Sequence, residues 1–201
     1  ALYRVHQLLD IRLIAEIADD RIIASLAREG GFTNVLWAGP ETISRGMREG
    51  AVKIQGTTRK RPTALKLGFA SDAFSYAIEL GMPVPVPGSL FNLDADIKRE
   101  AMWTGEKSTP AKLIADRRGP SLQVRSEDKS MRQLCTDLSG YDSMIRQVVG
   151  PDTPAEVAAL RSHLAHWRFY DQIRTDANAP ARQSFMGTRT MALDPDGSDL
   201  A

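Results

Sequence analysis

Apolar and polar side chains alternate through the middle of the chain, from 63 to 125. Apolar residues occupy every second position in two successive runs, 65–69 and 74–80, which are separated by a short turn at 71–73. A period of two that is repeated across a turn is typical of an antiparallel hairpin with one buried face. These two runs therefore predict the first two strands of a sheet.

The alternation continues beyond this hairpin. Residues 97–103 form a third strand candidate, and 112–116 and 122–125 form two more, joined by a turn at 117–120 that contains Gly and Pro. The sequence thus predicts an α+β fold built on an antiparallel meander of about five strands, a usual number for one sheet.

The N-terminal part has the period of a helix instead. Apolar residues recur at helical spacing over 1–29, with one interruption at Asp19 and Asp20, until Gly30 and Gly31 stop the pattern. A helix that is apolar over so much of its surface is expected to be buried, so we expect one long helix packed on the sheet. Residues 32–61 are typical of a loop, with one short strand candidate at 52–55.

Helical signals return after the meander. Ser139 is a candidate cap for a short helix that Gly150 and Pro151 end, and 153–156 form a capping box with proline at the first helical position. An aromatic strand candidate follows at 167–170. We therefore expect one domain with four parts: the helix 1–29, an antiparallel β-subdomain 51–125, a helical insertion 139–166, and a strand and irregular segment 167–201.

Composition narrows the possible functions. The 201 residues are 42% hydrophobic and 25% charged, with a net charge of +1, so the protein as a whole lacks the electrostatic footprint of a nucleic-acid binder. Cys135 is the single cysteine, which excludes a disulfide framework and fits a reducing cytoplasm. Because the chain begins with Ala1 in a helical pattern and ends without a tapering tail, we expect a piece of a longer protein.

Three motif-like stretches lack essential members. Lys107 follows Glu106 where a phosphate-binding loop needs Gly, so 103–109 is expected to be a solvated hairpin loop. His163 and His166 have helical spacing but no third ligand nearby for zinc. Residues 194–199 lack the closing Glu of a calcium loop and predict an Asx-type turn.

Two polar clusters leave two interpretations open. Arg59, Lys60 and Arg61 either contact phosphate groups of a nucleotide or of DNA, or form a solvated hairpin end. The second cluster either lines a site or forms an ion-pair network; its members are Arg168, Asp171, Arg174 and Asp176.

Several stretches together resemble the heads of RecF/SMC-like ATPases, the ABC-type branch of the P-loop NTPases, and in particular bacterial AAA-family predicted ATPases. The similarity covers nearly the whole chain. The stretches that carry it are Ala1-Leu-Tyr-Arg4, Leu26-Ala-Arg-Glu-Gly-Gly31, Val35-Leu-Trp-Ala-Gly-Pro40, Phe74-Ser-Tyr-Ala-Ile-Glu-Leu80, Ile97-Lys-Arg-Glu100 and Trp167-Arg-Phe-Tyr-Asp-Gln-Ile-Arg-Thr-Asp176.

The resemblance implies that a Walker A loop directly precedes Ala1, so that Ala1, Leu2 and Arg4 lie next to the nucleotide phosphates at a helix N-terminus. It makes Gln55 and Gln172 the two candidates for the Q-loop glutamine. It places the signature motif, the Walker B acid and the switch histidine beyond Ala201.

The implied parent protein is an ATPase that binds ATP and Mg²⁺, dimerises through the missing half of the head, and is coupled to DNA repair or phage defence. The 201 residues alone are expected to bind no cofactor and to be inactive. Two alternatives stay open: a non-catalytic binding or scaffold module, and the head of an ATPase–nuclease fusion of the overcoming-lysogenisation-defect (OLD) type.

Overall fold

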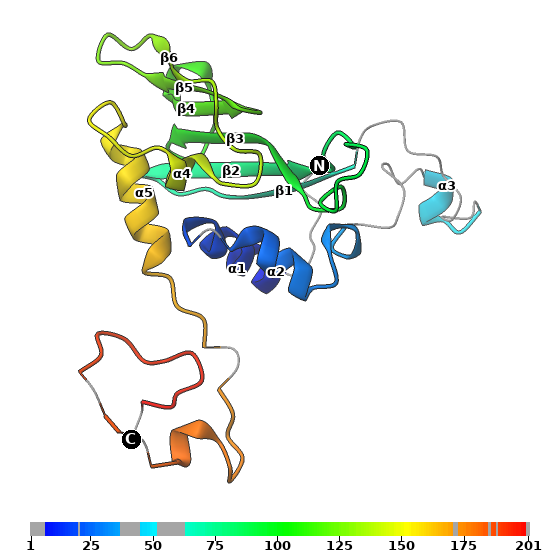
Figure 1. The fold of residues 1–201 in the computed structure, drawn as a ribbon, viewed down its shortest axis with the longest axis vertical. Helices are drawn as coiled ribbons and strands as arrows, with labels where there is room; N and C mark the ends of the chain where they lie inside the picture. The colour runs from blue at the N-terminus through cyan, green and yellow to red at the C-terminus, as the bar shows by residue number, and fades with distance from the viewer. Residues whose placement is uncertain are drawn as a thin grey trace. The chain divides into compact units, whose positions relative to one another are not determined.

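A six-stranded antiparallel sheet forms the centre of the fold, with its strands in the order in which they follow one another along the chain (Figure 1). The computed structural model describes residues 7–19, 21–36, 45–51, 63–170, 173–184, 186–187 and 189–199. The strands are β1 (Ala64–Phe69), β2 (Phe74–Gly81), β3 (Asp96–Thr104), β4 (Leu113–Arg118), β5 (Ser121–Arg125) and β6 (Met131–Cys135).

The fold class predicted from the sequence is confirmed as α+β with an antiparallel meander, and the bounds of one predicted turn need correction. The predicted turn at 117–120 is shorter, because Arg117 and Arg118 belong to β4 and only Gly119 and Pro120 separate the paired residues Arg118 and Ser121. Gly119 has a φ of +57°, which a tight two-residue connection needs and glycine adopts without strain.

The sheet also has a sixth strand, β6, that the alternation did not predict. It pairs with β5 and forms an edge of the sheet. Its residues are exposed or half-buried on both faces, so no row of buried positions marks it in the sequence.

One face of the sheet is covered by helices. The helices on this face are α1 (Gln7–Ala18), α2 (Ile22–Arg28), α4 (Met144–Gln147) and α5 (Ala155–Ala165). The four-residue helix α3 (Arg45–Arg48) has no buried residue. Helix α1 packs against β1, α4 and α5. It buries Leu13, Ile14 and Ile17 almost completely, which accounts for the apolar pattern of this segment.

The single long helix expected over 1–29 is wrong within the described residues, because α1 ends at Ala18 and a separate helix, α2, begins at Ile22. The side chain of Arg21 contacts both Glu16 and Asp19, with N–O distances of 2.6 Å to each. The expected stop is confirmed: Gly30 has a φ of +88°, and the N–H of Gly31 donates to the carbonyl of Leu26 at 2.9 Å, as in a Schellman motif.

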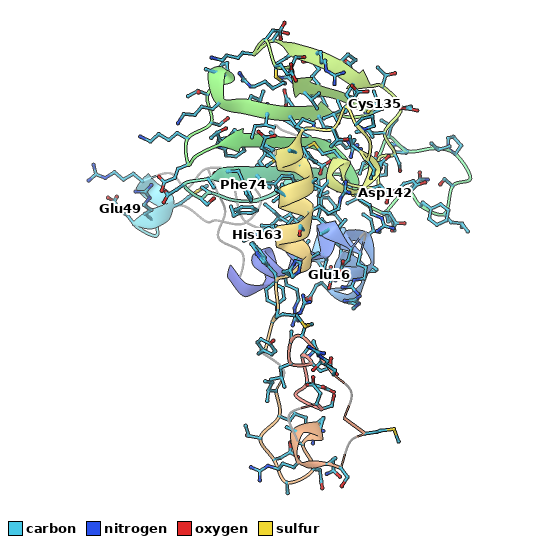
Figure 2. All side chains as sticks on the ribbon, turned by 90° about the vertical axis from the view of Figure 1, so that its left-hand side faces the viewer. Glu16, Glu49, Phe74, Cys135, Asp142 and His163 are labelled. Atoms are coloured by element: carbon cyan, nitrogen blue, oxygen red, sulfur yellow. The ribbon has the colours of Figure 1, made fainter. Side chains whose placement is uncertain are left out.

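Helix α5 begins at Ala155, within the predicted capping box 153–156 and one residue after the proline that was expected to open the helix. Its inner side buries Val157, Leu160 and Leu164. Figure 2 shows His163 of α5 and Phe74 of β2 side by side; their rings meet edge to face with centroids 6.0 Å apart. The expected apolar stripe is therefore the surface that joins α5 to the rest of its unit.

The chain divides into two compact units, 1–165 and 166–201. In the second unit, the aromatic strand predicted at 167–170 is wrong, because these residues form no strand. The turn predicted at 194–199 is confirmed: the N–H of Asp194 donates to the Asp199 carboxylate at 2.7 Å, and the N–H of Ser198 donates to Asp196 at 3.0 Å. The strand candidate at 52–55 lies outside the described residues.

Across the part of the chain that the structure describes, no helix combines the length and the apolar character that crossing a bilayer requires.

Candidate functional site: a buried carboxylate network beside an open pocket

The helix-covered face of the sheet contains one ion pair that is completely shielded from water. Glu100 of β3 and Arg117 of β4 are directly opposite each other in the register of the two strands. Both side chains have an exposed fraction of 0%, and the N–O distance between them is 2.8 Å. Removing two charges from water costs several kcal/mol per ion, so such a pair persists only when further hydrogen bonds satisfy both groups.

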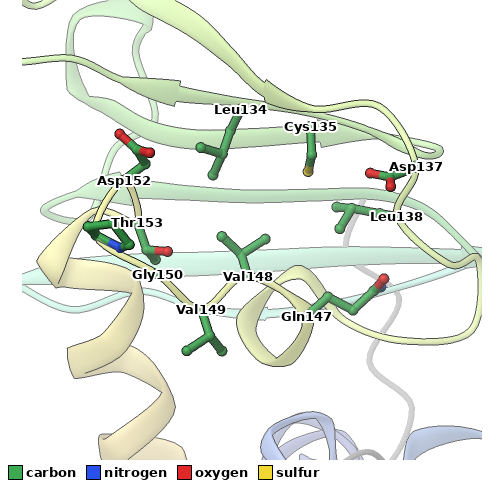
Figure 3. A pocket seen from close by; sticks show the side chains of 11 residues that line it. Leu134, Cys135, Asp137, Leu138, Gln147, Val148, Val149, Gly150, Asp152 and Thr153 are labelled. Carbon is green, nitrogen blue, oxygen red and sulfur yellow. The ribbon is translucent and has the colours of Figure 1, made fainter.

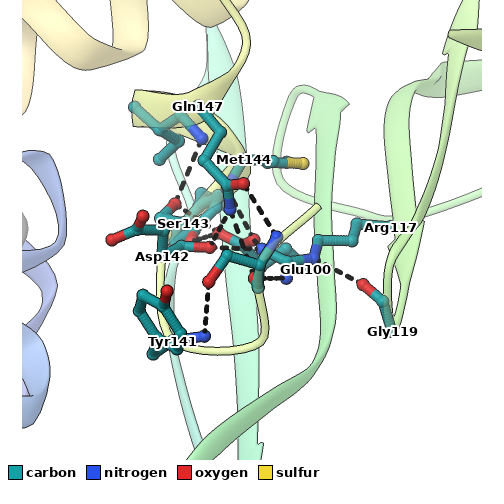
Figure 4. A network of polar contacts seen from close by, with 11 residues as sticks. Glu100, Arg117, Gly119, Tyr141, Asp142, Ser143, Met144 and Gln147 are labelled. Atoms are coloured by element: carbon teal, nitrogen blue, oxygen red, sulfur yellow. Dashed lines mark hydrogen bonds and ion pairs between the residues drawn. The ribbon is translucent and has the colours of Figure 1, made fainter. Parts of the chain in front are cut away.

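The Glu100 carboxylate receives four hydrogen bonds (Figure 4). The Tyr76 hydroxyl donates to it from β2 at 2.6 Å, and the backbone N–H of Met144 donates at 2.8 Å. The other two donors are the Arg117 guanidinium and the Ser143 hydroxyl. The carboxylate therefore binds the N-terminus of α4, where free N–H groups favour a negative charge.

Arg117 fixes the same segment from the other side. Its guanidinium donates to the carbonyls of Gly119, Asp142 and Ser139, at 2.7 Å for Gly119 and 2.6 Å for Asp142. Gln147 completes the arrangement, because its side-chain amide accepts from the Ser139 N–H at 2.8 Å and donates to Asp142 at 2.6 Å. Residues 139–147 are thus held to the sheet by polar contacts as well as by apolar packing.

The electrostatics of the network favour a neutral tyrosine. Burial raises the pKa of the Tyr76 hydroxyl well above its usual value, and the negative charge of Glu100 adds to the shift. Tyr76 therefore stays protonated and continues to donate its hydrogen bond to Glu100. Within the described residues, every buried side-chain nitrogen and oxygen has a hydrogen-bond partner. A network so completely satisfied and sealed acts as a structural connection.

An open pocket of about 390 Å³ lies next to this network (Figure 3). It lies between β6 and the connection from α4 to α5, and Gln147 belongs to both the network and the pocket. Its remaining polar side chains are Cys135, Asp137, Asp152 and Thr153. Arg132 already binds Asp152, at an N–O distance of 3.2 Å.

The chemistry available in the pocket is limited. Partial burial raises the pKa of the Cys135 thiol, and the charge of Asp137 raises it further. The thiol is therefore protonated near neutral pH and is a poor nucleophile. Over the described ranges, no three His, Cys, Asp or Glu side chains are grouped so that they could hold a metal ion.

Most site residues expected from the sequence lie outside the described residues. These are Ala1, Leu2, Arg4, Gln55, Arg59, Lys60, Arg61, Asp171 and Gln172. The interpretations offered for them stay predictions.

The described members of the C-terminal polar cluster include an ion pair. Arg174 contacts both oxygens of Asp176 at 2.8 Å and lowers the pKa of that carboxyl group. Both side chains are at least half exposed, as is usual for a surface ion pair of small energetic value. Arg168 donates to the carbonyl of Trp167 at 2.9 Å.

Sequence reasoning did not single out Glu100, Arg117 or Ser143. The available signal was the period of two within β3: Glu100 lies two positions before Met102, which is fully buried, and therefore on the same face of the strand. An irregular register between Glu79 and Leu80 shifts the alternation of β3 and hides this signal.

Comparisons of this chain with models of protein families, with curated proteins and with solved structures gave no match.

Proposed function

We propose that this chain is part of an ATP-binding and ATP-hydrolysing head of the RecF/SMC-like type. The observation that carries the proposal is the packing of α1 on β1, the first strand of an antiparallel meander that follows it in sequence. The resemblance implies the same order, in which a helix leaves the phosphate-binding loop and an antiparallel β-subdomain flanks the nucleotide.

The proposed chemistry depends on the N-terminal end of the first helical segment. A helix N-terminus offers free N–H groups and the positive end of the helix dipole, both of which favour phosphate. Ala1, Leu2 and Arg4 would lie there, and the lysine of the preceding loop together with Mg²⁺ would neutralise the charge of the transferred phosphoryl group.

The described residues contribute the framework around this site. Glu100 and Arg117 are fully buried and bonded to each other, so they are out of reach of a nucleotide. In the proposal, the catalytic groups come from the rest of the parent protein, which dimerises and couples its ATP cycle to work on DNA.

Calorimetric titration of ATP into the protein encoded by the complete reading frame tests the proposal. The matched control changes the lysine of the loop expected before Ala1 to alanine. Magnesium-dependent binding by the unchanged protein that is lost in this variant supports the ATPase head. No binding by either, with unchanged thermal unfolding of both, contradicts it and leaves the binding or scaffold module.

A further inference from the structure

A row of charged side chains crosses four strands on the face of the sheet opposite the helices. Its members on β1, β2, β3 and β4 are Lys66, Glu79, Arg99 and Arg118. Each member is directly opposite the next in the strand register, so the row is continuous. The signs of the charges alternate from Lys66 to Arg99, but Arg118 then places a second arginine opposite the first. Like charges in directly opposite positions destabilise a sheet.

Asp116 joins the two arginines into one cluster. One oxygen of its carboxylate accepts from the Nε of Arg99 and the other accepts from the Nε of Arg118, both at 3.1 Å. The Asp116 side chain is 8% exposed, whereas those of Arg99 and Arg118 are 50% and 74% exposed. The cluster therefore has a buried carboxylate and two guanidinium groups that reach the solvent.

This cluster has more positive than negative charge. Asp116 offsets one of the two arginines, and Glu79, the other carboxylate near them in the row, binds Lys66 at 3.0 Å. The position opposite Arg118 on the next strand is Ser121, which is uncharged. Among the described residues, no acceptor takes a hydrogen bond from the Nη atoms of Arg99, which binds Asp116 through Nε. Donors for an anion are thus available where the charge is in excess.

The geometry of the two arginines favours one class of anion. Directly opposite residues have Cβ atoms about 5 Å apart, so both guanidinium groups can reach a single small ligand. A guanidinium donates two parallel hydrogen bonds to a pair of oxygens. A carboxylate has one such pair and engages one arginine in this way, whereas a phosphate monoester has three terminal oxygens and can engage both. A second copy of this face carries the same excess charge and is repelled.

We propose that Arg99 and Arg118 bind the phosphate group of a phosphate monoester. Such a group carries about two negative charges near neutral pH, so its binding offsets the repulsion between the two opposite arginines. The group is either that of a free phosphate compound or that of a phosphorylated side chain, and the same chemistry binds both. This site does not depend on the proposed ATPase function, because it lies on the face opposite α1.

The test is a titration of the ¹⁵N-labelled 201-residue chain with inorganic phosphate at constant ionic strength, followed through the Nε–H signals of its arginines. We expect saturable shifts for Arg99 and Arg118 and none for Arg117, which is buried on the other face. The affinity should fall at least about tenfold in Arg99→Gln and in Arg118→Gln, because each variant loses hydrogen bonds to a charged group. It should not change in Arg174→Gln, the matched control, whose arginine is also exposed and bound to a carboxylate.

A short peptide with one phosphoserine is titrated in parallel, and the same peptide with glutamate in its place is the control for charge alone. Tighter binding of the phosphoserine peptide than of inorganic phosphate supports a site for phosphorylated proteins. Equal or weaker binding supports a site for free phosphate compounds.

Four results would overturn the proposal. They are the absence of saturable shifts with both phosphate probes, unchanged affinity in both arginine variants, an equal loss of affinity in Arg174→Gln, and equal binding of the glutamate peptide. Urea unfolding checks that each variant keeps its fold. We expect that it does, because each single variant leaves one arginine on Asp116.

Discussion

At the scale of single residues, Arg117 and Arg118 show how burial determines the contribution of an ion pair to protein stability. They are neighbours on β4 and point to opposite faces of the sheet. Arg117 is fully buried with Glu100, whereas Arg118 is 74% exposed and contacts Asp116 at 3.1 Å. The buried pair has no water to replace a lost partner, so its members depend on each other far more strongly.

We predict that Arg117→Met lowers the free energy of unfolding by about 3–5 kcal/mol, because it leaves the Glu100 carboxylate buried without its cation. Arg118→Met, the matched control, should change it by about 1 kcal/mol or less. Urea denaturation followed by circular dichroism measures both. Similar losses for the two variants would contradict the importance assigned to the buried network.

Tyr76 makes the stability of the folded protein depend on pH in the alkaline range. Its pKa is raised in the folded protein above the usual value of about 10 for the unfolded chain. Below about pH 10 the hydroxyl is protonated in both states, so its contribution to stability is fully present. Above that pH the unfolded state loses the proton first, and the contribution falls as pH rises toward the folded pKa.

We therefore predict that stability declines steeply above about pH 10 and that Tyr76→Phe declines less steeply. At neutral pH the variant should be less stable by about 1 kcal/mol, because Glu100 loses a donor. Tyr141→Phe is the control, since Tyr141 is 64% exposed. Urea midpoints between pH 8 and 11 measure the effect, and parallel curves for Tyr76→Phe and the unchanged protein would refute it.

At the scale of elements, the start of α4 shows how tertiary contacts choose a cap. Ser139 was expected to cap a helix over this segment, and that expectation is wrong. The cap is Ser143, whose hydroxyl accepts from the N–H of Ile145 at 3.1 Å and donates to Glu100. The carbonyl of Ser139 instead accepts from Arg117 and Gln147, which keeps residues 139–142 outside the helix.

We predict that Ser143→Ala lowers the free energy of unfolding by about 1–2 kcal/mol, through loss of the cap and of a donor to a buried carboxylate. Ser139→Ala should cost about 0.5 kcal/mol or less, because its hydroxyl makes one long contact, 3.4 Å from the Tyr141 nitrogen. Thermal unfolding of the two alanine variants compares them directly. A larger loss for Ser139→Ala would show that the original expectation was right.

At the scale of the whole molecule, the 1–165 unit is a framework in which helices cover one face of a continuous sheet. The opposite face carries charged side chains that pair across strands, such as Lys66 with Glu79 at 3.0 Å. Neither the exposed ion pairs on this face nor the buried Glu100–Arg117 network forms a catalytic site. The proposed ATP chemistry accordingly depends on groups that the resemblance places outside these 201 residues.

We predict that the 201-residue chain alone does not hydrolyse ATP, because its sequence contains no Gly-Lys-Ser or Gly-Lys-Thr to cradle the phosphates. Phosphate release measured with magnesium and excess ATP tests this, with the complete reading-frame product as the positive control. Turnover by the 201 residues that exceeds a blank would contradict the assignment of the catalytic groups.

The sequence predicted those elements whose determining residues lie close together along the chain, and it missed those that depend on residues far apart. The β1–β2 hairpin, the stop of α2 at Gly30 and the start of α5 at Ala155 follow from residues within a few positions of one another. Period, capping and glycine geometry act over that range, so these elements were predicted correctly. The buried site was not, because Glu100, Arg117 and Ser143 are up to 43 positions apart.

The sequence by itself determined the α+β class, the β1–β2 hairpin and the buried stripe of α5, because the burial of apolar side chains on one face produces a period of two in a strand and of 3.6 in a helix. Only the tertiary structure decided that Glu100 replaces solvent at the N-terminus of α4, that β6 extends the sheet, and that the 82–95 loop leaves Leu90 and Phe91 exposed. Each of these three features depends on which residues are neighbours in the folded protein although they are distant in sequence. The pattern of apolar and polar residues along the chain does not specify those neighbours.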